Sequence, residues 1–124
     1  MVDVELSFPA RPEFIRLARL VAADAGARAG FSVDDIDNLR IAVDELTFLL
    51  ANDSCSETVT LQYDIAPGLI EIRGGRHRGA DERGSLEPSD LAQAILQAVI
   101  DHYELEAANE HYGYRLVKRS RTPG

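Results

Sequence analysis

The sequence has little of what marks secreted, metal-binding or nucleic-acid-binding proteins. Its 124 residues include one cysteine, Cys55, so no disulfide can form within the chain, and a reducing cytoplasm is the expected location. The three histidines lack the spacing of a metal site, so we expect no bound metal. The 13 lysines and arginines are outnumbered by 21 aspartates and glutamates, and the net charge of -8 argues against nucleic acid as a partner.

The sequence also has no hydrophobic run of the roughly 18 residues that span a membrane. Its first residues, MVDVELSF, lack the basic and apolar regions of a signal peptide. We therefore expect a soluble, unexported protein that makes no membrane contact. The length fits a single domain, predicted over residues 1–119, with residues 120–124 as a frayed tail.

The strongest pattern predicts a central helix from Ser32 to about Asp53. Ser32 is a good N-cap, and Asp34 and Asp35 place negative charge beside the unpaired amides of the first turn. Apolar residues then recur at steps of three and four: Ile36, Leu39, Val43, Leu46 and Leu50. The face is widened by Ile41, Ala42, Phe48 and Leu49. We therefore expect this helix to be sandwiched inside the protein.

Weaker patterns surround the central helix. Alternation over residues 2–7 predicts a strand, and Pro12 suits the first turn of a helix that runs to about Ala25. The predicted buried stripe of that helix is Phe14, Leu17, Ala18, Val21 and Ala25. Residues 57–73 read as a hairpin with its turn at Pro67-Gly68, and the glycine-rich, charged residues 74–88 as a mobile loop.

The last third of the chain predicts a helix from Ser89 to about Ile100, followed by strands over 103–106 and 112–119. The predicted buried face of that helix is Leu91, Ile95, Ala98 and Val99. This order predicts an α+β fold, a two-layer sandwich with a five-stranded, mostly antiparallel mixed sheet and three helices on one face. The other face or the sheet edges are expected to carry Tyr63, Tyr103, Tyr112 and Tyr114, and an exposed apolar patch there would suggest a homodimer.

The element order and several segments resemble the small serine-kinase anti-sigma factors of bacteria, within the superfamily of histidine-kinase, gyrase and heat-shock-chaperone (GHKL) type ATPases. The segments that carry the likeness are FPARPEFIRLARLVAADAG, FSVDDIDNLRIAVDEL and, more weakly, LAQAILQAVIDHYELEAANEHYGYRLVKR. The resemblance implies a histidine-kinase-like ATPase fold and a protein partner, a sigma factor or an anti-anti-sigma antagonist.

The resemblance also implies a three-part Mg-ATP site, which this sequence matches poorly. Glu45 matches the general base, but Leu49 stands where the family has the asparagine that holds Mg²⁺, and hydrocarbon supplies no oxygen ligand. Arg73, Gly74 or Gly75 stands where the family has the aspartate that bonds adenine. The glycine-rich phosphate turn is replaced by Glu87, Pro88, Ser89 and Asp90. We therefore predict a pseudo-ATPase with no cofactor, and weak binding of ATP with Mg²⁺ as the alternative.

Two further groups of residues are candidates for partner contact. Glu13, Arg16 and Arg19 follow at steps of three, which indicates either a surface salt-bridge ladder or a binding surface. In the resembled family the first helix carries an arginine that contacts the sigma factor and the antagonist, and Arg16 is the matching position. The basic run Arg73, Arg76, His77, Arg78 and Arg83 is read as a solvated loop, with recognition of an acidic or phosphorylated partner as the alternative.

Three functions follow from these observations. The leading hypothesis is a non-catalytic, anti-sigma-like regulator that masks its partner, in which Glu45 is a vestigial base with a structural role. The first alternative is a divergent serine/threonine kinase that phosphorylates an anti-anti-sigma partner with Glu45 as its base. The second is a dimeric structural scaffold.

Overall fold

The structure is a computed structural model that describes residues 1–51, 57–79, 82, 86–108 and 110–121. The chain begins with strand β1 (Val4–Pro9), a short 3-10 helix η1 (Pro12–Phe14) and helices α1 (Ile15–Arg28) and α2 (Val33–Leu50). Strands β2 (Thr58–Ala66) and β3 (Leu69–His77) follow, then α3 (Asp90–Val99), β4 (His102–Ala108) and β5 (His111–Arg119). This order matches the prediction from the sequence.

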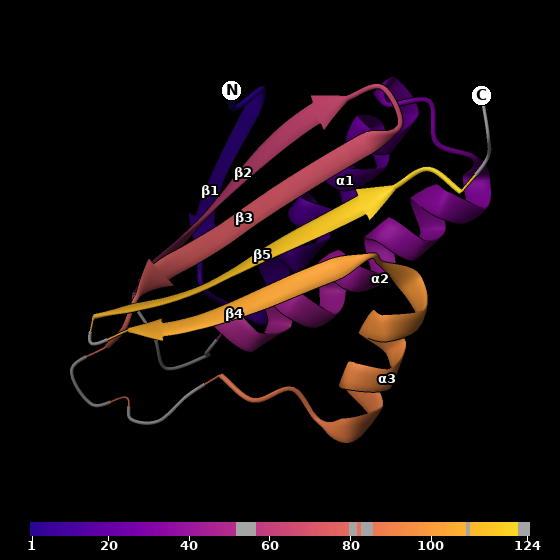
Figure 1. The fold of residues 1–124 in the computed structure, drawn as a ribbon. Coiled ribbons are helices and arrows are strands. Elements are labelled where there is room, and N and C mark those ends of the chain that lie inside the picture. Colours follow the sequence, from indigo (N-terminus) through magenta and orange to yellow (C-terminus); the bar gives the residue numbers. More distant parts are fainter. Residues whose placement is uncertain (52–56, 80–81, 83–85, 109, 122–124) are drawn as a thin grey trace.

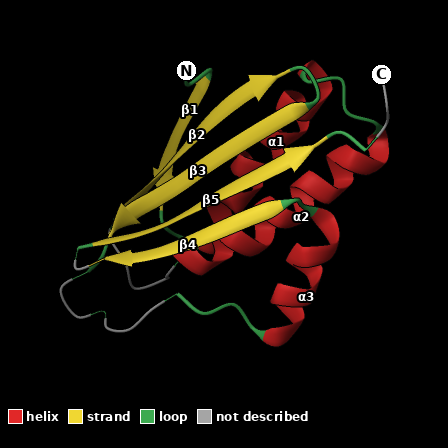
Figure 2. Ribbon diagram, in the orientation of Figure 1, coloured by secondary structure: helices red, strands yellow, loops and turns green. Residues whose placement is uncertain are grey.

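The five strands form one sheet in the order β1-β2-β3-β5-β4. All four strand pairings are antiparallel, so the sheet is not mixed as expected. The three α-helices pack behind one face, and the other face is open at the front of Figures 1 and 2. The predicted α+β two-layer sandwich is confirmed.

Helix α2 is the central element of the helical layer. The Ser32 hydroxyl caps it by accepting a hydrogen bond from the Asp35 amide at 3.1 Å, as the sequence predicts. Its inward face is fully buried at Leu39, Ala42, Val43, Leu46 and Leu50. Ile41 and Phe48 remain 41% and 61% exposed, so the expected burial on all sides is wrong. The sheet covers one side of α2, and no described element covers the side that bears these two residues.

Helix α1 packs through small side chains. Its buried residues are Ile15, Ala18, Ala22, Ala25 and Gly26. A β-carbon at Gly26 would lie 2.9 Å from Ile36 Cγ1, so the glycine permits close contact with α2. Leu17 is 43% exposed, which corrects the predicted stripe. The alanines of α1 allow the helix to pack closely against the neighbouring elements, whereas Leu17 and Leu20 remain exposed to solvent.

Helix α3 buries a stripe displaced by one residue from the prediction. The buried positions are Ala92, Leu96 and Val99, whereas Leu91 is 72% exposed and Ala98 is also exposed. The buried Ile100 ends the helix by donating its amide to the Leu96 carbonyl at 3.1 Å. This ending leads directly into β4 and fixes which face of the helix is turned toward the core. The sequence alone could not decide this, because the predicted and the observed apolar stripes have the same spacing.

Three of the four tyrosines lie on the helix side of the sheet, contrary to expectation, whereas Tyr103 lies on the edge strand β4, which is one of the expected places. Tyr63, Tyr112 and Tyr114 are buried, and Tyr103 is half-buried against the same core. The Tyr63 hydroxyl donates to the Ala18 carbonyl at 3.0 Å, and the Tyr114 hydroxyl shares a 2.8 Å hydrogen bond with Thr47. Because these hydroxyls have partners inside, the rings can be buried at little cost. Burial raises the pKa of both phenols.

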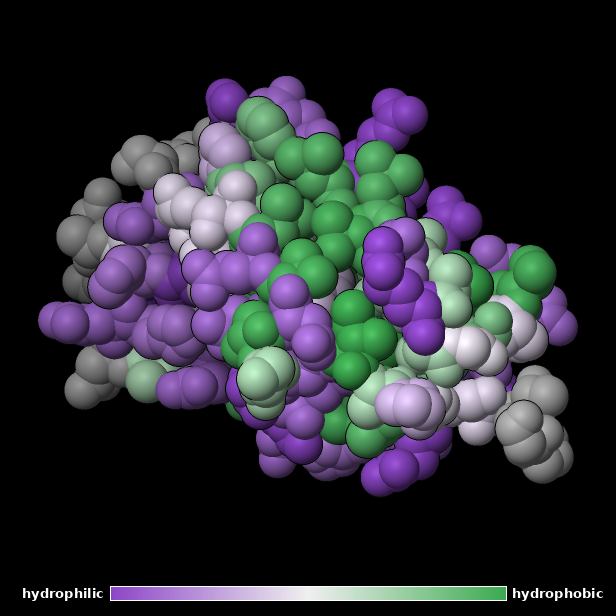
Figure 3. Space-filling model, turned by 90° about the horizontal axis from the view of Figure 1, so that it is seen from above, coloured by the Kyte–Doolittle hydropathy of each residue, from purple (hydrophilic) through white to green (hydrophobic). Residues whose placement is uncertain are grey.

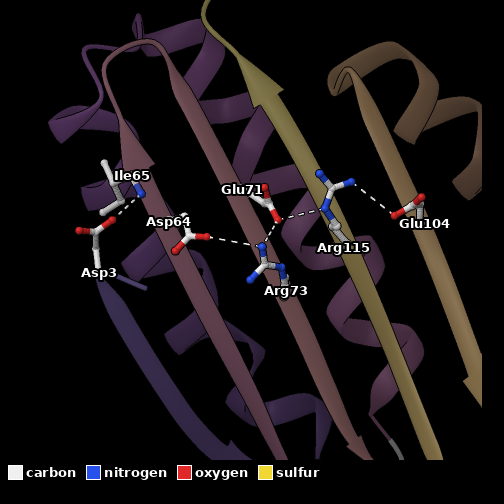
Figure 4. Close-up of polar contacts among 7 residues, drawn as sticks. All are labelled: Asp3, Asp64, Ile65, Glu71, Arg73, Glu104 and Arg115. Atoms are coloured by element: carbon white, nitrogen blue, oxygen red, sulfur yellow. Dashed lines mark hydrogen bonds and ion pairs between the residues drawn. The ribbon is translucent and has the colours of Figure 1, made fainter. Parts of the chain in front are cut away.

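The open face of the sheet carries a chain of charges instead of an apolar patch (Figure 4). Glu71 lies between two arginines, 2.6 Å from Arg73 and 3.0 Å from Arg115. The chain extends to Asp64 at 3.8 Å and to Glu104 at 3.4 Å. Burial alone would raise the pKa of the Glu71 carboxyl, but the two guanidinium groups hold it below its usual value. The face is thus polar along its centre.

The ends of the expected loop and tail are partly ordered by hydrogen bonds. Strand β3 continues through Gly74 and Gly75 to His77, so the loop does not begin at Gly74 as predicted. At the other end, the amides of Ser120 and Arg121 donate to the Gly68 carbonyl at 2.8 Å and to Asp35 Oδ2 at 3.0 Å. Residues 80–81 and 83–85 of the expected loop and 122–124 of the expected tail lie outside the described residues.

Candidate functional site

The places of the implied nucleotide site lie on α2, β3 and the turn before α3. Glu45 is half-buried and lines a groove of about 470 Å³ whose walls are Pro12, Ile15, Arg19, Asp44 and Phe48. It makes no ion pair with the described arginines of the basic run. Leu49, one turn later, packs against the hydrophobic core. At the two implied positions on α2 the chain therefore has one carboxylate, Glu45, and one hydrocarbon side chain, Leu49.

The second place, on β3, is closely packed. Gly74 points to the helix side, opposite Leu61 on β2 and Tyr114 on β5. A β-carbon at Gly74 would lie 2.6 Å from both Leu61 Cδ2 and Tyr114 Cε2. A side chain here must displace an aliphatic group or a ring that is itself buried. Arg73 and Gly75, the other candidate positions, point to the open face of the sheet.

The third part of the implied nucleotide site, the turn before α3, is the capped N-terminus of that helix. The Ser89 hydroxyl accepts a hydrogen bond from the Ala92 amide at 3.1 Å, and Gln93 Nε2 donates to the Pro88 carbonyl at 3.1 Å. The side chain of Ser89 thus satisfies one of the amides that a phosphate-binding helix would offer to its ligand. Among the described residues no group of three or more His, Cys, Asp or Glu side chains is placed to hold a metal ion.

The three candidate partner-contact residues do not form a ladder along α1. Glu13 pairs with Arg11 at 3.2 Å, and Arg19 pairs across the helical layer with Asp44 at 2.9 Å. Burial raises the pKa of the Asp44 carboxyl even though Arg19 and Arg40 oppose this effect. Arg16 is exposed and makes no ion pair with any described residue.

Exposed apolar side chains lie near Arg16. Leu20, one turn after Arg16, is 58% exposed, and Leu17 is next to it in the chain. Figure 3 shows hydrophobic residues gathered at the centre of the face of the molecule that is seen from above. We call Arg16, Leu17 and Leu20, together with Ile41 and Phe48 of α2, the outer helix surface. Large exposed apolar residues beside a free guanidinium are typical of protein interaction surfaces.

The basic run is divided by the strand that contains it. Because successive residues of a strand point to opposite faces, Arg73 and His77 are exposed on the open face while Arg76 is buried on the helix side. Arg78 is half-buried beyond the strand end, and Arg83 lies outside the described residues. The interpretation of Arg76 as part of a solvated loop is therefore wrong.

Arg76 occupies the C-terminal end of α2. Its Nε donates to the Leu50 carbonyl at 2.5 Å, and its Nη atoms form two 2.7 Å hydrogen bonds with the two carboxylate oxygens of Glu82. The guanidinium also lies over the ring of Tyr112, 5.1 Å from its centroid. The sequence does not reveal the partners of Arg76. It offers one signal of its burial, because Arg76 falls on the same side of the strand alternation as the buried Ile70, Ile72 and Gly74.

A second buried cation, Lys118, lies near the N-terminal end of α2. Its Nζ is 3.6 Å from Asp35 Oδ1, and both side chains are almost fully buried. Burial lowers the pKa of Lys118, and Asp35 opposes this effect. Burial by itself would raise the pKa of Asp35, but the Arg121 amide, Lys118 and Ser32 together hold it below its usual value.

Comparison with known proteins gives one consistent relationship, although no family model matches the sequence. Serine-protein kinase RsbW of Oceanobacillus iheyensis is 31% identical over 68 residues, which are 55% of this chain and 43% of that protein. The enzyme of the same name from Bacillus velezensis is 33% identical over 73 residues, 58% of this chain and 41% of that protein. That of Listeria innocua is 35% identical over 74 residues, 56% of this chain and 47% of that protein.

Over these segments the chain is similar to serine-protein kinase RsbW. The resemblance predicted from the sequence is thereby confirmed as a likeness in sequence. The matched segments span less than half the length of these RsbW proteins. No helix in the described part of the chain is both long and apolar enough to cross a membrane.

Proposed function

We propose that this protein is a non-catalytic, anti-sigma-like regulator that binds and masks a protein partner through its outer helix surface. The partner class, a sigma factor or an anti-anti-sigma protein, follows from the resemblance to the anti-sigma kinases. Masking would be stoichiometric, because the protein would act by occupying its partner's surface and not by modifying it. The observation that carries the proposal is that the implied Mg-ATP positions contain hydrocarbon and packed glycine.

Three features of the packing support the absence of Mg-ATP chemistry. Leu49 contributes hydrocarbon to the core where Mg²⁺ would need an oxygen ligand. A carboxylate at position 74 would overlap the places that Leu61 and Tyr114 occupy. The helix start at Ser89 is capped by its own side chain. The residues present at these places do not fit the nucleotide, and we derive no phosphoryl-transfer step through them.

Exposure and charge support the outer helix surface as the binding site. A leucine or phenylalanine left in water forgoes about 1.5–3 kcal/mol of burial free energy, which a partner can recover. Leu20 and Phe48 are 58% and 61% exposed, and Arg16 is free to form an ion pair. Arg16 can therefore provide specificity while the apolar residues provide affinity.

The absence of catalysis is tested by calorimetric titration with Mg-ATP. We expect no saturable heat at micromolar nucleotide in the wild type or in Glu45→Gln, whose circular dichroism spectrum should match the wild type. Saturable micromolar binding that is lost in Glu45→Gln would contradict the proposal and support the divergent kinase. Retention of Glu45 is the observation that favours this alternative.

The binding surface is tested by purifying the protein from its native cells together with its partner. We expect a sigma factor or an antagonist to co-purify. Affinity for that partner should fall about tenfold or more in Arg16→Ala, as is typical of interface hot spots. Arg40→Ala, an exposed arginine of α2 that pairs with Asp37, is the matched control. Unchanged affinity in Arg16→Ala would exclude this role, and a homodimer without either partner would favour the scaffold alternative.

A further inference from the structure

The pairing of β3 with β5 brings together two histidines that are far apart in the sequence. His77 is the last residue of β3 and His111 is the first residue of β5, and the two lie directly opposite each other on neighbouring strands (Figure 1). Both side chains are exposed on the open face of the sheet, because the residues next to them in each strand point to the helix side. The spacing of the histidines in the sequence could not show this pair.

The two histidines form the kind of pair in which cross-strand side chains come closest. The Arg78 amide donates to the Glu110 carbonyl at 2.9 Å, so these adjacent residues form a hydrogen-bonded pair. Hydrogen-bonded and non-hydrogen-bonded pairs alternate along an antiparallel sheet, which makes His77 and His111 a non-hydrogen-bonded pair. The β-carbons of such a pair are about 4.5–5.5 Å apart. Two nitrogens that bind one zinc ion are at most about 4 Å apart, so imidazoles at these positions can reach the same metal.

A hollow beside the two histidines leaves room for a metal ion and its remaining ligands. The next pair on the same face is Gly75 and Gly113, neither of which has a side chain. The ring of His111 lies close over both glycines. A β-carbon at Gly75 would be 2.6 Å from its Cε1, and one at Gly113 would be 2.9 Å from its Nε2. Both histidines line a hollow of about 340 Å³ that includes Gly75. A metal beside the histidines would therefore meet no side chain of β3 or β5 at the next position.

The nitrogens of the two imidazoles are available as ligands. Neither ring makes a hydrogen bond or an ion pair with any described residue. Both rings can therefore turn about their side-chain bonds to direct a nitrogen at a shared metal. Imidazole suits zinc, copper and nickel, whereas calcium and magnesium prefer oxygen ligands. The pair of donors thus selects late transition metals.

The charges around the hollow do not oppose a cation. Arg73 and Arg115 share Glu71 at 2.6 and 3.0 Å, and Arg115 also reaches Glu104 at 3.4 Å (Figure 4). Glu106 lies opposite Gly113 on β4, and it makes no ion pair with any described residue. The arginines are therefore balanced by carboxylates, and Glu106 adds a negative charge on the same face of the sheet.

We propose that His77 and His111 form a binding site for a divalent late transition metal such as zinc, and that water completes the coordination. Two imidazoles on one sheet bind a metal more tightly than either does alone, because the second nitrogen is already close when the first has bound. The site lies on the face of the sheet opposite the helices that bear the outer helix surface (Figure 1). It therefore does not depend on the proposed function.

Calorimetric titration with zinc chloride tests the proposal, in a buffer free of chelators and nucleotide. The protein carries no affinity tag, and Cys55→Ser removes its one thiol. We expect saturable binding of one zinc ion per chain. Copper(II) should bind more tightly than zinc, in keeping with the general order of divalent metals. Magnesium should give no saturable heat, because it prefers oxygen ligands. Absence of saturable zinc binding, or equal binding of magnesium, would overturn the proposal.

Histidine variants show whether the two side chains bind one metal together. We expect His77→Ala and His111→Ala each to weaken zinc binding at least about tenfold, because each removes one of the two linked ligands. The double variant should be little weaker than either single one. His102→Ala is the matched control, since His102 is an exposed histidine on β4 that lies 3.5 Å from Glu104, and this variant should keep the zinc affinity of the parent protein. Full affinity in either His77→Ala or His111→Ala, or two zinc ions per chain, would exclude a shared site.

Discussion

The two faces of the sheet use the same residue types in opposite ways. On strand β3, Arg73 points to the open face and shares Glu71 with Arg115, while Arg76 points inward and is fixed by a carbonyl, a carboxylate and an aromatic ring. The two arginines are three positions apart in the sequence. The outer arginine is exposed and lies in a chain of charges that water reaches in part. The inner arginine is buried among its carbonyl, carboxylate and aromatic partners, which water cannot replace.

The inner face also shows how a buried cation depends on its position along a helix. Arg76 lies at the C-terminal end of α2, where unpaired carbonyls and the helix dipole favour positive charge. Lys118 lies near the N-terminal end, where the dipole opposes a cation, and its Nζ makes no hydrogen bond to any described group. Asp35 at 3.6 Å supplies the necessary negative charge. Of the two buried cations, Lys118 therefore has fewer hydrogen-bond partners than Arg76.

The largest effect is expected from Arg76→Ala. Removing the buried guanidinium takes its donor from the Leu50 carbonyl, takes two hydrogen bonds from the Glu82 carboxylate and opens a space beside Tyr112. We expect a loss of about 3–5 kcal/mol in the free energy of unfolding, measured with urea. Arg73→Ala in the same strand is the control and should cost no more than about 0.5 kcal/mol. A similar loss of unfolding free energy in both variants would mean that arginines on the two faces of the sheet contribute equally to stability.

The second effect tests the pair at the other end of α2. Asp35→Asn removes the nearest counter-charge of the buried Lys118 ammonium, and we expect a loss of about 3 kcal/mol in urea unfolding. Adding Lys118→Met should recover much of this loss, because a buried ion pair is often replaced by hydrocarbon without net cost. If the double variant is as unstable as Asp35→Asn alone, Asp35 stabilises the fold through Arg121 and Ser32 and not through Lys118.

The third effect compares two adjacent glycines. In Gly74→Ala the new methyl group meets Leu61 and Tyr114 in the buried layer, and we expect a loss of about 1–3 kcal/mol. Gly75→Ala places its methyl group 2.6 Å from His111 Cε1, which belongs to an exposed side chain that can rotate away. Its loss in thermal unfolding should therefore be clearly smaller. Equal losses would mean that the outer histidine is as firmly packed as the inner ring.

The smallest expected effect is the contribution of two carboxylates, Asp35 and Glu71, to the pH dependence of the unfolding free energy. The pKa values of Asp35 and Glu71 are both lowered in the folded protein, so both carboxylates contribute stability that is complete above their usual pKa, near 4. This stability is lost as the pH falls through the lower folded values. We expect Asp35→Asn to flatten the acid side of the unfolding profile more than Glu71→Gln does. If Glu71→Gln flattens the profile more, the larger part of the pH-dependent stability comes from Glu71 on the open face of the sheet.

The sequence predicted what depends on local chemistry. The cap at Ser32, the turn at Pro67-Gly68, where Gly68 has φ +70°, and the alternation of β5 are all present as expected. It did not predict which face of α3 is buried. Two apolar stripes on this helix have the same spacing, and the choice between them depends on how the chain passes through Ile100 into β4. The side of the sheet chosen by Tyr114 depends on Thr47, which is 67 residues away and invisible to any local pattern.

The candidate site was predicted in part. Glu45 and Leu49 were identified by position, but the closeness of Leu61 and Tyr114 to Gly74 emerges only when three strands lie side by side. The burial of Arg76 and Lys118 was missed for the same reason. An arginine or lysine in a strand reads as solvent-exposed until its partners, Glu82 and Asp35, are brought to it by other segments.

Helix α1 has its small residues on the inside and its large ones on the outside. Ala18, Ala22 and Ala25 hold it to the domain, while Leu17 and Leu20 face water. In the function proposed above, folding and recognition depend on different residues of this one helix. Substitutions at the two leucines can change what the surface binds without disturbing the core, so a protein of this kind can acquire a new partner by a few outward changes while its architecture stays the same.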